Sequence, residues 1–114
     1  MLDDIAPEAG FVAVAIVSRS GVPLAWRLPE EAHVDNFSTM AATLVGAVDV
    51  ILTGLHKASS DRSVITTDGG VIVAQAITEG AFIVGVLGTL TAKAEAALEA
   101  AANRAKAVVG SDEL

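Results

Sequence analysis

Residues 63–87 read SVITTDGGVIVAQAITEGAFIVGVL. This segment contains three apolar stretches that are separated by the short turn-forming segments DGG and TEG. Each stretch is rich in Val, Ile or Thr, a composition typical of β-strands. Asp and Gly readily adopt the positive φ angles of a tight hairpin turn, so DGG predicts that the first strand folds back on the second. Residues 71–77 and 81–87 lack a clean apolar and polar alternation, so we expect both faces of these strands to be covered by helices. The stretch predicts a three-stranded antiparallel meander inside a layered sheet.

A second hairpin is predicted upstream, in GFVAVAIVSRSGVPLAWR at residues 10–27. Its two β-rich runs, 10–17 and 22–26, flank SRSG, where Gly21 can supply a positive φ. Pro23 cannot donate a backbone hydrogen bond, so we expect the second strand at an edge of the sheet. SRSG could hold a nucleophilic serine or cradle a phosphate, but it leads from strand to strand and matches neither a nucleophile elbow nor a P-loop. We therefore interpret it as a turn.

A long helix is predicted between the hairpins, over residues Asn36–Lys57 with Asp35 as its N-cap. Apolar residues at helical spacing form a stripe that we expect to pack on the sheet: Phe37, Met40, Ala41, Leu44, Val45, Val48, Ile51, Leu52 and Leu55. The residues on the opposite side are also mostly small or apolar, and only a few polar residues there are expected to face solvent. Helices of this kind are normally buried on two sides, so we predict that a second chain contacts Thr43, Gly46, Ala47, Val50 and Gly54.

The chain closes with an Ala-rich helix, predicted over residues 92–109, capped by Thr91 or Thr89 and ended at Gly110. Its inner stripe is expected to be Leu98, Ala101, Ala105 and Val108. The predicted order is ββαβββα, an α/β domain with a five-stranded antiparallel sheet and helices on its faces. We assign this domain to residues 10–110, after a short segment at 1–9 and before a tail at 111–114.

Composition limits the classes of function. The 114 residues suit one domain, and 53% hydrophobic against 18% charged residues predicts a folded chain. Fourteen acidic and seven basic residues give a net charge of −7, which disfavours nucleic acid and anionic membrane surfaces as partners. The longest apolar run, Phe11–Val17, is too short to span a bilayer, and the start MLDD lacks the basic region of a signal peptide. We expect a cytoplasmic protein.

Residues capable of chemistry are few and scattered. The chain has no Cys, and His33 and His56 have no second ligand at metal-binding spacing, so we expect no metal site and no cofactor. Glu30 and Glu31 are adjacent in a loop, where neighbouring carboxylates point apart and stay solvated rather than acting as an acid/base pair. We expect no catalytic residues and no enzymatic activity.

The lone Trp26 allows two interpretations. It could be an edge aromatic that packs within the monomer, or an anchor that contacts a partner, because Trp and Arg are enriched in binding hot spots. Arg27 follows it directly, and the acidic pair Glu30 and Glu31 comes shortly after. We predict a partner-binding site at these four residues, where the acidic pair would speed association with a basic surface.

The chain resembles the roadblock/LC7 family, which has a profilin-like fold. GFVAVAIVSRSGVPLAW is similar to the opening hairpin of that family, and VILTGLHKASSDRSVITTDGGVIVAQAI is similar to its central helix followed by its paired middle strands. The resemblance covers residues 10–109. It implies a homodimer in which the central helices and the edge strand that follows them pair into a ten-stranded sheet, which would place Val64 in the interface. It also implies a platform or regulator for a small Ras-like GTPase.

Two other functional classes are weighed against this one. A small-molecule sensor of the profilin-like or PAS-like type would hold its ligand between sheet and helix. The expected filling of Val, Ile and Leu offers few convergent polar groups for such a ligand. A small hydrolase would need a nucleophile with a base beside it, and the sequence provides no such pair.

Overall fold

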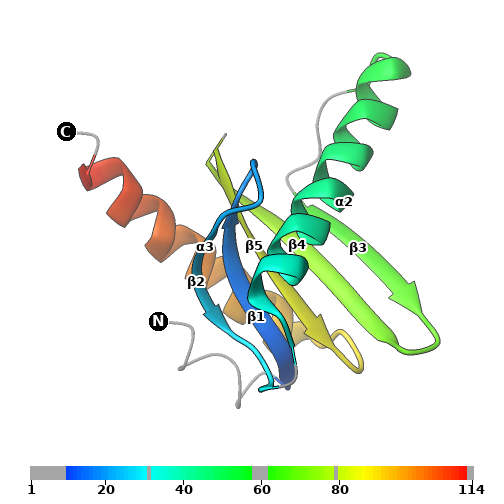
Figure 1. The fold of residues 1–114 in the computed structure, drawn as a ribbon, viewed down its shortest axis with the longest axis vertical. Helices are drawn as coiled ribbons and strands as arrows, with labels where there is room; N and C mark the ends of the chain where they lie inside the picture. Colours follow the sequence, from blue (N-terminus) through cyan, green and yellow to red (C-terminus); the bar gives the residue numbers. More distant parts are fainter. Residues whose placement is uncertain (1–9, 31, 58–61, 79, 113–114) are drawn as a thin grey trace.

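The computed structural model describes residues 10–112 except 31, 58–61 and 79. Its elements are β1 (Phe11–Ser18), β2 (Pro23–Arg27), α2 (Val34–Gly54), β3 (Arg62–Thr67), β4 (Gly70–Thr78), β5 (Ala81–Leu87) and α3 (Ala92–Asp112). The strands form one antiparallel sheet in the order β2-β1-β5-β4-β3 (Figure 1). The predicted element order and fold class are confirmed.

Pairing between β1 and β5 joins the hairpin to the meander. These strands are far apart in sequence, and they pair from Phe11 opposite Leu87 to Ser18 opposite Ala81. The joint puts β1, β5 and β4 inside the sheet and leaves β2 and β3 as its edges. The edge position that Pro23 predicts for the second strand is confirmed.

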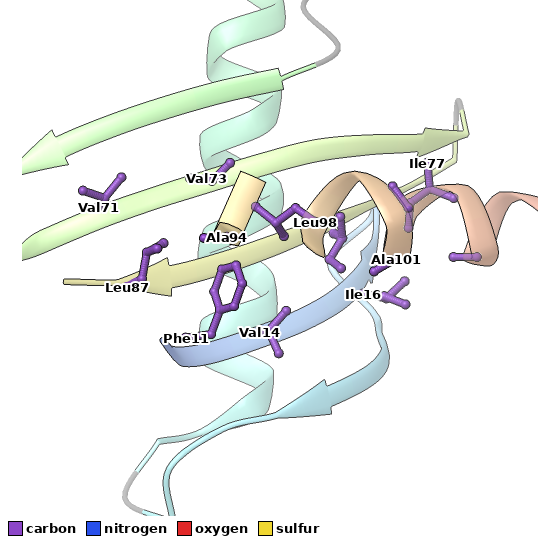
Figure 2. Close-up of a cluster of buried hydrophobic side chains, with 13 residues drawn as sticks. Phe11, Val14, Ile16, Val71, Val73, Ile77, Leu87, Ala94, Leu98 and Ala101 are labelled. Atoms are coloured by element: carbon purple, nitrogen blue, oxygen red, sulfur yellow. The ribbon is translucent and has the colours of Figure 1, made fainter. Parts of the chain in front are cut away.

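A helix covers each face of the sheet (Figure 1). On the α3 face, side chains of β1, β4 and β5 form a core with the buried stripe of α3, and Figure 2 shows these side chains converging on Leu98. The members are Phe11, Val14, Ile16, Val71, Val73, Ile77, Ile83, Leu87, Ala94, Leu98, Ala101, Ala102 and Ala105. A smaller core on the α2 face contains Ala15, Val17, Ala41, Val45, Ala74, Phe82 and Val84. Two-sided coverage of the inner strands is thus confirmed.

The SRSG stretch is a turn, as predicted. The Ser18 N–H donates to the Val22 carbonyl at 2.9 Å, and the Ser18 Oγ accepts the Val22 N–H at 2.9 Å. Gly21 has a φ of 94°, which a residue with a side chain rarely adopts. An added Cβ at Gly21 would also lie 3.3 Å from the Thr39 Cα, so glycine lets the turn approach α2 closely.

The DGG turn differs from the expectation in its backbone angles. Among its three residues only Gly70 has a positive φ, at 145°, whereas Asp68 and Gly69 do not. The Thr67 hydroxyl stabilises the turn instead, because its Oγ1 accepts the Gly69 N–H at 3.1 Å and donates to the Gly70 carbonyl at 2.9 Å. A side-chain bond of this kind replaces the local geometry that the Asp-Gly pair predicts.

The helix ends also differ from the predicted ones. Helix α2 begins at Val34, so Asp35 lies in its first turn, where a carboxylate favours the helix dipole, and His33 is the N-cap without a side-chain bond. It stops at Gly54, shortly before His56 reaches a left-handed φ of 58°. Helix α3 continues past Gly110, because a glycine ends a helix only where the chain turns away.

The cap of α3 at Thr91 is confirmed. The Thr91 Oγ1 accepts the Ala94 N–H at 3.1 Å. Leu98, Ala101 and Ala105 are buried as predicted, and the side chain of Val108 lies outside the described residues.

A glycine under an aromatic ring offers a test of this core. An added Cβ at Gly85 would lie 2.4 Å from the Phe11 Cε1, and the ring is itself buried against α3. We expect Gly85→Ala to lower the free energy of unfolding by about 1 to 3 kcal/mol, as overpacking does. Chemical denaturation at one protein concentration measures this. Gly80→Ala is the control, because its nearest neighbour is 3.9 Å away; equal effects in both variants would contradict the packing described.

Candidate interaction surface

Helix α2 leaves much of its apolar surface uncovered. Its buried residues are only Ser38, Ala41 and Val45. Met40, Ile51 and Leu55, which the sequence predicts on the sheet-facing stripe, are 61%, 62% and 65% exposed. The prediction is wrong for these three because the sheet meets only the narrow small-residue side of the helix, and the last turns of α2 extend past the strands (Figure 1).

An apolar groove of about 650 Å³ runs beside α2, between the helix and the sheet. It is lined by Ala32, His33, Asn36, Phe37, Met40, Ala41, Leu44, Ile72, Val84 and Val86. By strand register, Ile65 of the edge strand β3 faces the same side as Ile72. The groove thus lies between the large apolar flank of α2 and the β4 and β5 strands, and it opens toward β3.

The predicted dimer-interface residues of α2 lie on its outer side. Thr43, Ala47, Val50 and Gly54 are exposed, and Gly46 is half-buried. An added Cβ at Gly46 or Gly54 would meet no atom within 4 Å, so the monomer itself does not require glycine there. The Thr43 hydroxyl donates to the Thr39 carbonyl at 2.9 Å, so this donor is satisfied within the helix.

Val64 is not brought together with these helix residues. It is 45% exposed on the edge strand β3, and it pairs with Val73, which packs against α3. Paired residues of antiparallel strands share a face, so Val64 lies on the α3 face rather than the α2 face.

An ion pair fixes α2 to the first hairpin. The Arg19 Nη1 lies 2.5 Å from the Asp49 Oδ2, and both side chains are partly buried. A contact across 30 residues leaves no local pattern, so sequence alone could not find it. The hairpin covers this flank of α2 and leaves the groove side open.

A similar ion pair joins β3 to α3. The Arg62 Nη1 donates to the Glu95 Oε1 at 2.7 Å, and the Arg62 Nε donates to the Gln75 Oε1 at 3.1 Å. Arg62 thus ties the edge strand β3 to the helix behind it.

A second exposed surface lies along the edge strand β2. Trp26 is 51% exposed, and Arg27 and Glu30 are exposed as well; Glu31 lies outside the described residues. Leu24 is 55% exposed on the same strand, and the residues predicted from the sequence do not include it. The alternation of the large Leu24 and Trp26 with the small Ala25 in PLAWR is the sequence signal that could have found it.

The described residues bring together little that could react. Ser18 and Ser20 bond each other at 2.9 Å, and His33 and His56 are both exposed. Within the part of the chain that the structure describes, no three His, Asp or Glu side chains gather at metal-binding distance. The best candidate for a functional site is therefore the exposed apolar surface of α2 together with its groove.

Solved structures with the same arrangement of elements identify the fold. MglB from Myxococcus xanthus superposes with a TM-score of 0.87 at 10% identity, covering 95% of this chain and 90% of that one. The gliding protein MglB from Thermus thermophilus gives 0.80 at 19% identity, covering 94% and 84%. A roadblock/LC7 domain from Streptomyces avermitilis gives 0.76 at 10% identity, covering 88% and 86%. The chain has the roadblock/LC7 fold.

Sequence comparison adds nothing to this result, since no protein-family model and no curated protein matches the chain. At identities this low, the shared arrangement shows the roadblock/LC7 fold and leaves the chemistry of the surface to be argued from its own residues. The resemblance stated from the hairpin and the central helix is confirmed at the level of fold.

The half-exposed side chain of Trp26 is compatible with both of its interpretations, and mutation can test them. Because half of the side chain is already in solvent, Trp26→Ala should lower the free energy of unfolding by only about 1 kcal/mol. Phe82→Ala, at a side chain that is 1% exposed, should cost about 3 to 5 kcal/mol. Thermal and chemical denaturation of both variants measures this. A comparable loss of unfolding free energy in both variants would show that Trp26 packs within the monomer.

Proposed function

We propose that this protein is a homodimeric, non-catalytic interaction module of the cytoplasm that serves as a platform or regulator for a small Ras-like GTPase. The observation that carries the proposal is the uncovered apolar surface of α2 beside an apolar groove. A monomer would expose Met40, Val50 and Ile51 at 61%, 72% and 62% in one helix, and Met40 lines the apolar groove. Contiguous exposed apolar surface of this kind marks an interface.

A second copy fits this surface. Two α2 helices can lie side by side when small residues face outward, and Ala47 and Gly54 leave room for a helix at short distance. The large flank of one α2 would then fill the groove of the other copy. The free edge of β3 lies on the same side and could extend the sheet across the dimer.

By length and composition alone, α2 could also cross a membrane. Two contacts argue for a globular role: Ala41 and Val45 pack on the sheet, and Asp49 holds Arg19 in an ion pair. A charged residue held in this way would be costly inside a bilayer. The apolar exterior of α2 therefore supports burial against protein.

The GTPase partner rests on the roadblock/LC7 resemblance and on the lack of reactive groups in the described surface. A dimeric surface without a nucleophile or metal site can act by binding one conformation of a partner more tightly than another. Such a role requires a surface with both apolar and polar side chains, and α2 exposes residues of both kinds.

A ligand-binding sensor is the second candidate, and the groove itself favours it. Its volume of about 650 Å³ lies within the usual range of small-molecule pockets. His33 and Asn36 are the polar residues at its rim, and both are exposed. A ligand held by so few polar groups would be recognised by its shape and its apolar contacts. A helix of the second copy could occupy the groove in the same way.

The dimer can be tested with one charged substitution. Ala47→Arg places a bulky cation on the outer side of α2, where desolvation in an interface costs several kcal/mol. We expect light scattering to show a monomer for this variant and a dimer for the native chain. Ala100→Arg is the matched control, because Ala100 is exposed on α3, the helix on the other face of the sheet. If Ala47→Arg stays dimeric, the interface lies elsewhere.

The Gly46→Ala variant tests whether the dimer needs a glycine at this position. The monomer has space for the new methyl group, so helix propensity should raise monomer stability by up to about 1 kcal/mol. If the second α2 packs closely there, the same change should weaken dimerisation. Sedimentation equilibrium across a dilution series reports the dimer constant; a dimer as strong as the native one would exclude close helix contact at Gly46.

The GTPase partner calls for a capture experiment. Tagged native protein and the Ala47→Arg variant are incubated with native cell extract, with GTP or GDP added, and retained proteins are identified by mass spectrometry. We expect a small GTP-binding protein retained by the native dimer in a nucleotide-dependent manner. Retention of no GTP-binding protein by the native dimer would contradict the proposed partner and leave the dimer prediction standing.

A further inference from the structure

The two helices are held on the sheet by contacts of different strength. Both helices have 21 residues. On α3 the buried residues are all apolar, namely Ala94, Leu98, Ala101, Ala102 and Ala105. On α2 the buried residues are Ser38, Ala41 and Val45, and one of them is polar. Because stabilisation by burial grows with the apolar area removed from water, α2 is the more weakly docked helix.

The contact between α2 and the sheet also buries polar atoms that make no hydrogen bond. Within the part of the chain that the structure describes, the Ser38 Oγ and the Arg19 Nε are buried and have no hydrogen-bond partner. Ser38 is fully buried in α2, and Arg19 belongs to the turn that forms the ion pair with Asp49 of α2. A buried polar group without a partner loses its hydrogen bonds to water and gains none in return. Both atoms therefore weaken the docking of α2.

The ion pair between Arg19 and Asp49 does not offset this weakness. The two side chains are 32% and 26% exposed, and ion pairs in contact with solvent contribute little to stability. The pair also holds α2 at one position on its hairpin flank, whereas the last turns of the helix extend past the strands (Figure 1). Most of the length of α2 is thus left without a strong contact inside the monomer.

The two helices also differ in their own tendency to be helical. Helix α2 reads VDNFSTMAATLVGAVDVILTG, in which eight of the 21 residues are Val, Ile or Thr and two are Gly. Helix α3 contains nine Ala among its 21 residues. Ala is the best helix former, whereas β-branched residues and Gly are poorer ones. Helix α2 therefore needs tertiary contacts to stay helical, and α3 depends on them less.

We propose that α2 is a conditional element of the fold: in the separated monomer it detaches from the sheet and unfolds, and a second copy packed on α2 suppresses this opening. The inference rests on the dimer proposed above. The core on the α3 face is built from β1, β4, β5 and α3, so it persists when α2 opens. A second copy that binds only the docked form of α2 stabilises that form by mass action. The apolar surface proposed to bind a partner is then complete only in the dimer.

Hydrogen exchange followed by mass spectrometry tests the proposal on the intact chain. Peptides from α2 and from α3 are compared in the same sample, after correction for their intrinsic exchange rates. The native chain is measured well above and well below its dimer dissociation constant, which sedimentation equilibrium provides. We expect α2 to be protected in the dimer, and in the monomer to exchange at least about tenfold faster than α3. Equal protection of both helices in the monomer, or fast exchange of α2 in the dimer, overturns the proposal.

The Ala47→Arg variant separates this inference from the proposed function. Ala47 is exposed on the outer side of α2 and Arg is a good helix former, so the substitution leaves the contact between α2 and the sheet unchanged. A variant that stays dimeric contradicts the α2 interface itself. A monomeric variant in which α2 is as protected as α3 contradicts only the inference. A monomeric variant with fast exchange in α2 and slow exchange in α3 supports both.

A variant that strengthens the contact of α2 tests the cause of the opening. Ser38→Ala removes the unbonded hydroxyl and introduces a better helix former, so in the monomer it should slow the exchange of α2 about tenfold and leave α3 unchanged. Thr39→Ala is the matched control, because Thr39 is exposed at the next position and the change improves only helix propensity. It should slow the exchange of α2 by roughly twofold to threefold. Unchanged exchange of α2 in Ser38→Ala, or equal slowing by both variants, overturns the proposal.

Discussion

The sheet holds α2 through a narrow stripe of small side chains, and the surfaces of this protein follow from that contact. Ser38, Ala41 and Val45 are the residues of α2 that become buried. Small residues allow a close approach but cover little width, so the larger side chains of Met40, Ile51 and Leu55 stay exposed.

The first hairpin determines which flank of α2 stays open. A Cβ added at Gly21 would lie only 3.3 Å from the Thr39 Cα, so the SRSG turn approaches α2 closely. Arg19 of the same turn forms an ion pair with Asp49. These two contacts close the hairpin side of the helix. The groove side keeps its apolar lining of Phe37 and Leu44, which suits another protein surface better than water.

The two edges of the sheet differ in their exposed side chains. Pairing of β1 with β5 moves β2 and β3 to opposite ends. β3 lies beside the groove, where a second copy is proposed to pack, while β2 presents Leu24 and Trp26 away from it.

The sequence by itself determined the strands, the two turns and the order of elements, because alternation, β-branched residues and glycine act within a few neighbouring residues. It also determined that α2 has more apolar surface than one sheet can bury. Only the tertiary structure decided which of those residues become buried: Met40, Ile51 and Leu55 share the apolar pattern of Ala41 and Val45, yet they are exposed. The Arg19 and Asp49 pair likewise depends on how distant segments meet, and no local pattern encodes that meeting.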